Sequence, residues 1–219
     1  MELIGIPSIA IVAGATGLVG RELVRQLGAD QTWGEVRPLV RRQLPPELAG
    51  ATVAPVQVDY DRLDPPPPWA AADHVFCALG TTIRQAGSRA AFREVDLKYP
   101  VALARAALLL GARHFLLVSA VGAAPGSRVF YNRVKGEVEA AIAALGFRSV
   151  TIARPSLLLG SRPEPRVGEQ VGKILGLLAP PRWRPVAGAR VARALVDAAK
   201  ADLAGLRVIE NRDLRAARG

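Results

Sequence analysis

The stretch Ile9-Ala10-Ile11-Val12-Ala13-Gly14-Ala15-Thr16-Gly17-Leu18-Val19-Gly20 decides the fold of this chain. It begins as a short apolar run with β-branched residues, which is the pattern of a fully buried parallel strand. Glycines follow at three-residue spacing, at Gly14, Gly17 and Gly20. The pattern then becomes helical and predicts a helix over Leu18–Leu27, with one apolar stripe along it.

Strand, glycine turn and helix together predict a cradle for the phosphates of a nucleotide. We expect Gly14 to permit the tight turn, Gly17 to let the backbone approach a diphosphate, and Gly20 to let the helix pack closely on the sheet. The helix N-terminus then presents free N–H groups and the positive end of its dipole to the anion. We expect the helix to end at a glycine cap, Gly28. The predicted cofactor-binding residues of this cradle are Gly14, Thr16, Gly17, Leu18, Val19 and Gly20.

Length and composition favour one globular domain over residues 1–219. Of the 219 residues, 50% are apolar and 22% are charged, which excludes a disordered chain. No apolar run approaches the length that a membrane span needs, and the first seven residues do not resemble a signal peptide. Cys77 is the only cysteine, so no internal disulfide is expected. These features predict a soluble, cytoplasmic protein.

The net charge is strongly positive, which fits either a nucleic-acid-binding surface or an ordinary solvated basic surface. The net charge is +10, and arginine supplies 25 of the 29 basic residues, spread along the whole chain. A nucleic-acid binder more often shows a stripe of basic residues with aromatic neighbours, which this chain lacks. We therefore prefer a solvated basic surface. The expected partner is a small-molecule substrate, with no nucleic acid and no membrane, and the chain is expected to be a monomer or a homodimer.

Strand and helix signals alternate along the chain, which predicts an α/β fold with a doubly wound parallel sheet of the Rossmann type. Further strands are expected over Glu35–Val40, Thr52–Val58, His74–Ala78, His114–Ser119, Ser149–Ala153 and Leu206–Ile209. Further helices are expected over Ser88–Leu110, Val129–Leu145 and Val191–Lys200. We expect the first of these helices to break near Asp96 and Pro100, and the run Pro65–Pro68 to form a surface link.

The segment Gly160–Gly188 differs in composition, since it is rich in proline, glycine and arginine. It contains one expected amphipathic helix, Val167–Leu178. An excursion after the sixth strand is where an α/β enzyme would build a substrate pocket, so we interpret it as a small C-terminal substrate-side segment. It could equally be an ordinary surface connection.

The end of the second strand bears on the choice of dinucleotide. A carboxylate at this position would accept hydrogen bonds from the ribose hydroxyls and repel a 2′-phosphate. Here the strand is followed by Arg41 and Arg42, and two guanidinium groups suit a phosphate. The place of Arg41 and Arg42 directly after this strand favours NADPH or NADP+ as the cofactor. The alternative is that the two residues are ordinary surface arginines. The other residues predicted to approach the dinucleotide are Asp59, at the adenine, and Leu79, Gly80 and Thr81, in the turn after the fourth strand.

Three residues further along carry the predicted chemistry. Ser119 ends the fifth strand, which places it at the carboxyl edge where α/β sheets bind ligands. Tyr131 and Lys135 are four residues apart in a helical stretch and therefore share one face. A phenol can give a proton to a developing alkoxide, a nearby ammonium favours the phenolate, and a serine hydroxyl can hold the substrate oxygen. The alternative is that Tyr131 caps an edge of the core and Lys135 pairs with Glu139 at the surface.

His74 and His114 open strands and lack partners at ligand spacing in the sequence. We interpret both as structural residues and expect no metal site.

In these features the chain resembles the short-chain dehydrogenase/reductases, and in particular the atypical branch that contains the human HIV Tat-interacting protein and its bacterial relatives. The matching segments are Gly14–Gly20, Leu39–Arg42, Cys77–Thr82, His114–Ser119, Tyr131–Glu137 and Arg154–Ser156. The resemblance implies a Rossmann core, NADPH binding and a catalytic set of Ser119, Tyr131 and Lys135. It also implies that the turn after the sixth strand, with Pro155 and Ser156, touches the nicotinamide.

Two functions from different classes remain open on the sequence. The first is an NADPH-dependent oxidoreductase acting on a small carbonyl or alcohol substrate. The second is an NADPH-binding sensor or regulatory protein without turnover; the presence of Tyr131 and Lys135 favours the enzyme. A nucleotide-sugar epimerase or dehydratase would use the same residues, but the short C-terminal part leaves little room for a sugar-nucleotide domain.

Overall fold

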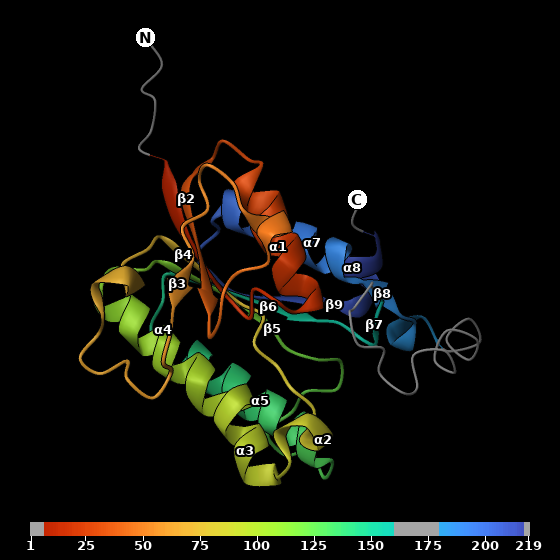
Figure 1. The fold of residues 1–219 in the computed structure, drawn as a ribbon. Coiled ribbons are helices and arrows are strands. Elements are labelled where there is room, and N and C mark those ends of the chain that lie inside the picture. The colour runs from red at the N-terminus through yellow and green to blue at the C-terminus, as the bar shows by residue number, and fades with distance from the viewer. Residues whose placement is uncertain (1–6, 160–179, 217–219) are drawn as a thin grey trace.

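Seven parallel strands form one sheet, in the order β3-β2-β1-β4-β5-β6-β9. The computed structural model describes residues 7–159 and 180–216 and confirms the predicted α/β class (Figure 1). The strands are β1 (Ser8–Ala13), β2 (Trp33–Val40), β3 (Val56–Gln57), β4 (His74–Cys77), β5 (His114–Val118), β6 (Ser149–Arg154) and β9 (Gly205–Glu210). The chain order reverses between β1 and β4, which is the crevice where doubly wound sheets bind nucleotides.

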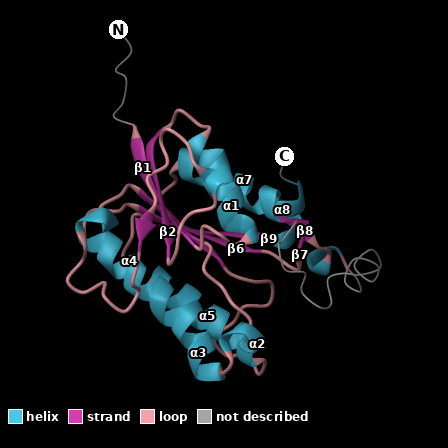
Figure 2. Ribbon diagram, in the orientation of Figure 1, coloured by secondary structure: helices cyan, strands magenta, loops and turns pink. Residues whose placement is uncertain are grey.

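Helices cover both faces of the sheet (Figure 2). On one face lie α1 (Leu18–Gly28), α7 (Gly188–Ala201) and α8 (Asn211–Ala216). On the other lie α4 (Tyr99–Leu109) and α5 (Phe130–Ala143), with α2 (Ile83–Ala86) and α3 (Arg89–Arg93) beyond them. This arrangement explains why β1 reads as an unbroken apolar run, since both of its faces are covered.

Two hydrophobic cores sit on the two faces, and β1 contributes to both. Ala10 and Val12 pack with the α1 and α7 side, whereas Ile11 and Ala13 pack with the α4 and α5 side. All four are fully buried. Successive side chains of a strand point to opposite faces, so a single apolar run supplies two cores.

The predicted strands agree with the structure except at the third. A strand over Thr52–Val58 was expected, but β3 spans only Val56–Gln57, preceded by an isolated bridge between Val36 and Val53. Pro55 lies between the bridge and the strand, and proline has no N–H to donate to a ladder. The edge of the sheet is therefore short and irregular.

The expected glycine cap at Gly28 is wrong. Gly28 is the last residue of α1, and the residue after it, Ala29, has an ordinary right-handed conformation (φ −93°). A Cβ at Gly28 would lie 3.1 Å from Cγ2 of Val53. The absent side chain therefore serves the close packing of α1 on the segment that precedes β3.

The long helix expected over Ser88–Leu110 is divided into three parts. Between α3 and α4 lies a π-helical turn, Glu94–Lys98, so the winding changes at Asp96 but the helix continues without the expected break. Pro100 does not break the helix, because it lies in the first turn of α4, where its missing N–H costs no helical hydrogen bond. The expected helices over Leu18–Leu27, Val129–Leu145 and Val191–Lys200 correspond to α1, α5 and α7.

Several short elements were not anticipated. A second sheet of two strands joins β7 (Leu158–Leu159) to β8 (Val186–Ala187) in parallel. The short 3-10 helices are Pro46–Leu48, Pro68–Ala70 and Pro181–Trp183. The expected helix Val167–Leu178 lies outside the described residues. Among the residues that are described, no helix is long and apolar enough to cross a bilayer.

Candidate active site

The glycine turn between β1 and α1 is closely packed against the end of β4. Gly14 has a φ of +78°, and a Cβ there would lie 2.5 Å from the carbonyl oxygen of Ala78. A Cβ at Gly20 would collide with the carbonyl oxygen of Gly14, so this glycine lets α1 approach the turn itself. The N–H of Gly17 donates to the same carbonyl oxygen at 3.0 Å. Gly14 and Gly20 are therefore both needed to bring the N-terminus of α1 over the carboxyl edge of the sheet.

The start of α1 offers backbone groups to a ligand, not side chains. Thr16 and Gly17 are exposed, while the side chains of Leu18 and Val19 are buried in the core. The first intrahelical bond in the turn runs from the N–H of Arg21 to the carbonyl of Gly17, at 2.9 Å. The preceding N–H groups have no carbonyl four residues back within the helix. Such a cradle fits a diphosphate, because backbone donors and the helix dipole both favour an anion.

The end of β2 carries two exposed cations. Arg41 and Arg42 line a pocket of about 700 Å³ together with Gln57, and neither forms an ion pair with any described residue. Asp59 follows β3 and is already partly engaged: its carboxylate accepts from the N–H of Asp61 at 3.1 Å and pairs with Arg62 at 3.5 Å. The side chain of Asp59 is 57% exposed, so it keeps capacity for another donor.

The turn after β4 lies over a buried ion pair that the sequence analysis did not predict. Nζ of Lys135 is 2.8 Å from Oδ1 of Asp96, and both residues are almost fully buried. The other carboxylate oxygen accepts from the N–H of Thr81 at 2.9 Å. A Cβ at Gly80 would lie 3.8 Å from Nζ of Lys135. One carboxylate thus connects the predicted dinucleotide turn, which includes partly buried Leu79, to the predicted catalytic lysine.

The electrostatics of this pair keep Lys135 charged. Burial has the largest single effect and would lower the pKa of Lys135, but the charge and hydrogen bond of Asp96, together with Tyr131 and Cys77, raise that pKa above its usual value. The alternative that Lys135 pairs with Glu139 does not hold. Glu139 instead pairs with Arg154, at 2.6 Å.

Tyr131 lies near the charged end of this ion pair, and Ser119 lies at the end of β5. Tyr131 is one helical turn before Lys135 on α5, and its ring packs on buried Phe92 with centroids 5.7 Å apart. Ser119 directly follows β5 and is only 5% exposed. Its hydroxyl has no hydrogen-bond partner among the described residues. A buried hydroxyl without a partner is costly in a native fold and suggests a ligand atom that completes it.

The loop after Ser119 is held against α5. The N–H of Ala124 donates to the carbonyl of Asn132 at 3.0 Å. A Cβ at Gly136 would collide with the backbone of Ala124 and Pro125, so the loop approaches the helix as closely as a glycine allows. Because this helix also carries Tyr131, the packing fixes the loop that starts at Ser119 against the helix of the predicted tyrosine.

The turn after β6 is fixed by hydrogen bonds. The carbonyl of buried Pro155 accepts from the N–H of Val121 at 2.9 Å. The N–H of Ser156 donates to Oδ1 of Asn211 at 2.9 Å, and its hydroxyl donates to the carbonyl of Trp183 at 2.7 Å. The side chain of Ser156 therefore holds the protein's own backbone. Contact of this turn with a nicotinamide stays a prediction.

A histidine cluster lies at the opposite, amino edge of the sheet. His74 and His114 face each other in the register of β4 and β5, and Asp202 joins them, with possible ligand atoms within 4.8 Å of one another. Sequence spacing did not show this meeting. Arg113 and Arg148 hold the carboxylate of Asp202 at 3.1 and 2.8 Å, and their charges oppose a metal cation. We retain the structural interpretation of both histidines.

Asp96 is the functional residue that the sequence analysis missed. The signal was present: an acidic residue interrupts a helical stretch that is otherwise rich in apolar residues. A carboxylate on a buried face needs a cationic partner, and the sequence offers 29 of them, four lysines and 25 arginines. Nothing in local spacing shows which of these partners the fold brings to it.

A glycine cradle at the first crossover, with ligand-facing groups along the carboxyl edge, defines a dinucleotide-binding protein of the Rossmann type. The comparisons with known proteins agree. The model of a family described as NAD(P)H-binding matches residues 14–202. The chain therefore belongs to this NAD(P)H-binding, oxidoreductase-like family.

Its relatives place it on the atypical branch that the sequence indicated. Protein HTATIP2 of Rattus norvegicus is 37% identical over 175 residues, covering 78% of this chain and 72% of the relative. The FMP52 proteins, named mitochondrial, of Eremothecium gossypii and Coccidioides immitis are 37% and 35% identical. They cover 77% and 89% of this chain, and 75% and 86% of the relatives.

Solved structures share the fold at low sequence identity. MoeE5 in complex with UDP-glucose and NAD gives a TM-score of 0.71 at 17% identity, covering 92% of this chain and 75% of that one. The oxidoreductase ylbE from Lactococcus lactis gives a TM-score of 0.67 at 17% identity and covers 95% of both chains. These likenesses confirm the Rossmann fold.

The expectation of a cytoplasmic protein is contradicted by the relatives, since the FMP52 proteins are named mitochondrial. The expectation rested on a missing secretory signal, a missing membrane span and a lone cysteine. None of these features separates the cytosol from the mitochondrion.

Proposed function

We propose that this protein is an NADPH-dependent oxidoreductase of the short-chain dehydrogenase/reductase type that acts on a small carbonyl or alcohol substrate. The observation that carries the proposal is the buried, unpartnered hydroxyl of Ser119 at the carboxyl edge of β5. It lies at the same edge as the glycine cradle and follows the strand next to β4. A substrate oxygen is the partner that this hydroxyl lacks.

The chain's own residues then divide the work. When bound, the dinucleotide supplies a hydride to the carbonyl carbon or accepts one from the alcohol. In the reductive direction, the hydroxyl of Ser119 donates a hydrogen bond to the substrate oxygen and holds it for attack. The hydroxyl of Tyr131 transfers its proton to that oxygen as negative charge develops there. Lys135 supplies a fixed positive charge beside the phenol, and Asp96 holds its ammonium in place.

The preference for NADPH rests on Arg41 and Arg42. Both are exposed directly after β2, where the 2′ position of the adenosine ribose lies in Rossmann folds, and neither has an ion-pair partner in the described part of the chain. Two free guanidinium groups attract a 2′-phosphate and offer it bidentate hydrogen bonds.

Turnover is tested with a panel of aldehydes, ketones and quinones, followed by the oxidation of NADPH. We expect Tyr131→Phe to lower kcat by a factor of about 10² to 10⁴, because it removes the proton donor, while NADPH binding is unchanged. Tyr99→Phe is the matched control, since the Tyr99 hydroxyl contacts Asp61 at 3.4 Å, and it should retain turnover. Equal activity of Tyr131→Phe and the parent protein would refute the assigned role.

Cofactor choice is tested by fluorescence titration with NADPH and NADH. We expect NADPH to bind more tightly, and Arg41→Ala with Arg42→Ala to reduce the gap about tenfold or more, since charged hydrogen bonds contribute about 1.5–3 kcal/mol each. Arg25→Ala is the control, because Arg25 lies on α1 and pairs with Glu22. Equal affinities for both dinucleotides in the parent protein would overturn the preference.

One observation favours a second function, that of an NADPH-binding sensor without turnover. The carboxylate of Asp96 offsets part of the positive charge that Lys135 would direct at the phenol. Tight NADPH binding, with no oxidation of NADPH across the whole panel, would support the sensor and exclude the oxidoreductase.

A further inference from the structure

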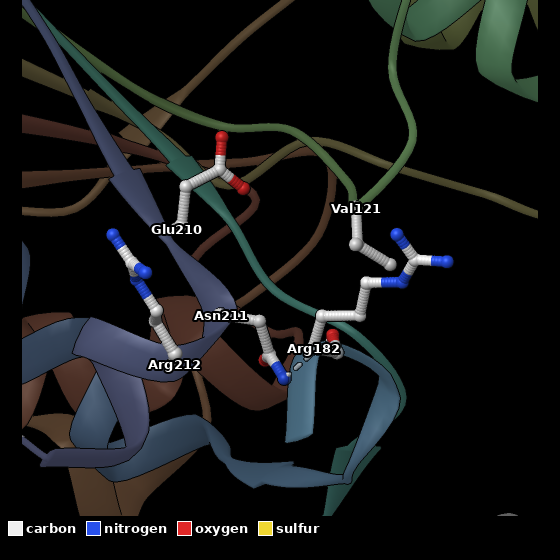
Figure 3. A pocket seen from close by; sticks show the side chains of 5 residues that line it. All are labelled: Val121, Arg182, Glu210, Asn211 and Arg212. Carbon is white, nitrogen blue, oxygen red and sulfur yellow. Dashed lines mark hydrogen bonds between the residues drawn. The ribbon is translucent and has the colours of Figure 1, made fainter. Parts of the chain in front are cut away.

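A small pocket lies at the carboxyl edge, beyond Ser119. None of the residues that line it has been assigned a catalytic or cofactor-binding role. It has a volume of about 210 Å³, and Figure 3 shows the five side chains that line it. These residues are Val121, Arg182, Glu210, Asn211 and Arg212. Val121 is two residues beyond Ser119, and Glu210 ends β9. The pocket therefore opens on the edge of the sheet where the predicted chemistry takes place.

The backbone around Arg182 is held in place at this pocket by hydrogen bonds from a buried asparagine. Asn211 is 1% exposed, and its Nδ2 donates to the carbonyls of Arg182 at 3.1 Å and Arg184 at 2.8 Å. Between them, the carbonyl of Trp183 accepts from the hydroxyl of Ser156 at 2.7 Å. Three consecutive carbonyls are thus held by side chains from two other segments. Such a mount fixes the direction in which the Arg182 side chain leaves the backbone.

Trp183 connects this mount to the predicted catalytic helix. A Cβ at Gly122 would lie 3.7 Å from Cη2 of Trp183 and 3.0 Å from Nδ2 of Asn132. Asn132 directly follows Tyr131 on α5. The indole is 42% exposed, and the guanidinium of Arg182 lies 5.6 Å from its ring centre. An exposed aromatic plane and a cation therefore stand beside the loop that starts at Ser119.

Among the residues that the structure describes, the charges around the pocket leave Arg182 without a counter-ion. Glu210 is paired with Arg154 at 3.2 Å, and Arg154 also binds Glu139. Arg212 is 3.5 Å from Asp213. Arg182 forms no ion pair with any residue that the structure describes, and Figure 3 shows its guanidinium extended toward Val121 and away from Glu210. A cation of this kind attracts an anion from solution.

We propose that the substrate of this site carries a carboxylate, which Arg182 binds, while the ring of Trp183 packs on the substrate's planar part. This inference rests on the proposed oxidoreductase function and narrows its substrate to carbonyl compounds with a carboxylate. The guanidinium presents a planar pair of N–H donors, which matches a carboxylate in bidentate fashion. The carbonyl end of such a molecule then faces Ser119 and Tyr131.

The test compares two aldehydes that differ in one charge, 4-carboxybenzaldehyde and its neutral methyl ester, methyl 4-formylbenzoate. With NADPH in excess, the parent protein should reduce the acid with a kcat/KM at least about tenfold above that of the ester, because a hydrogen-bonded charge pair is worth about that much. Arg182→Gln should remove this preference, mainly by raising the KM for the acid. Arg207→Gln, an exposed arginine on β9 outside the pocket, should keep the preference.

The outcomes separate the two proposals. Reduction of both aldehydes with equal kcat/KM would overturn the carboxylate site and leave the oxidoreductase intact. If neither aldehyde is reduced, the binding of benzoate and benzamide to the NADP+-loaded protein decides, read from tryptophan fluorescence. Tighter binding of benzoate that Arg182→Gln abolishes would support the carboxylate site without turnover, and equal binding of the two would overturn it.

Discussion

At the amino edge of the sheet the carboxylates and guanidinium groups are paired with one another, whereas at the carboxyl edge several polar groups have no partner within the described residues. Asp202 at the amino edge contacts Arg113 and Arg148, and Arg113 also binds Asp73 at 2.9 Å. At the carboxyl edge, the hydroxyl of buried Ser119 lacks any such partner. The same strands thus begin beside paired carboxylates and guanidinium groups, where ring nitrogens of buried His74 and His114 lack a hydrogen-bond partner among the described residues, and β5 ends at the unpartnered hydroxyl of Ser119.

This difference separates stability from function. Groups that are paired within the fold contribute to folding and gain nothing from a ligand. Groups left unpaired cost folding energy and can be completed by a ligand. Two carboxyl-edge features break the pattern: Arg154 binds Glu139 and Glu210, and Lys135 is both a predicted catalytic residue and a member of a buried ion pair. Variants at this pair and at the amino edge therefore test how far the separation holds.

The largest effect on stability is expected at Lys135. Lys135→Met leaves the carboxylate of Asp96, which is fully buried, without its cation. Breaking a buried pair on one side costs about 3–5 kcal/mol of the free energy of unfolding. Urea denaturation measures this loss, and NADPH oxidation should be lost with it.

A double variant distinguishes folding from catalysis at the same place. In Asp96→Asn with Lys135→Met, the asparagine oxygen can still accept from the N–H of Thr81, and no charge stays buried. We expect most of the lost stability to return while NADPH oxidation stays absent. Recovery of turnover in the double variant would show that the lysine is only structural.

Acid is expected to lower the free energy of unfolding by about 3 kcal/mol, through the buried histidines of the amino edge. Burial is the main cause that lowers the pKa of His114 to about 4 and lowers that of His74 as well. In the unfolded chain these groups titrate near their ordinary value of about 6.5, so the unfolded state binds more protons between those values. The free energy of unfolding should therefore fall as pH drops from about 6.5 toward 4. His114→Gln should give a shallower dependence in urea titrations, and an unchanged slope would contradict the assignment.

A smaller effect is expected from Asp202→Asn. The substitution removes the negative charge that Arg113, Arg148 and His114 share, while asparagine tolerates the left-handed backbone at this position (φ 41°). Because Asp202 is 24% exposed, we expect a loss of about 1–2 kcal/mol. NADPH affinity should not change. A large fall in affinity would show that the two edges are coupled.

Most of the fold follows from local sequence patterns. The apolar run from Ile9 and the glycines after it predict β1, the turn and α1, because both faces of that strand must be covered. The prediction fails where a tertiary contact overrides a local rule. Gly28 was read as a helix cap but serves the packing of Val53, and Pro55 shortened the third strand. These outcomes depend on neighbours that are distant in sequence.

The candidate site follows less completely. Ser119 and the pair Tyr131 and Lys135 can be named from the sequence, because a strand end and a four-residue spacing fix their positions. Asp96 and Arg182 could not be named in this way. Asp96 pairs with a lysine that lies 39 residues further along the chain. Arg182 is held in place by a hydrogen bond from Asn211 to its carbonyl group. No spacing rule reveals either contact.

The π-helical turn Glu94–Lys98 carries a consequence for engineering this chain. A π-helical turn contains one residue more than the α-helix would need, so the chain ahead of it is rotated by about 100° relative to a regular helix. Deleting a single residue from this turn would restore regular winding and swing Asp96 away from the lysine. A one-residue deletion would therefore break the same buried pair as a substitution of Asp96 itself, so the length of this segment constrains the chain as well as its composition.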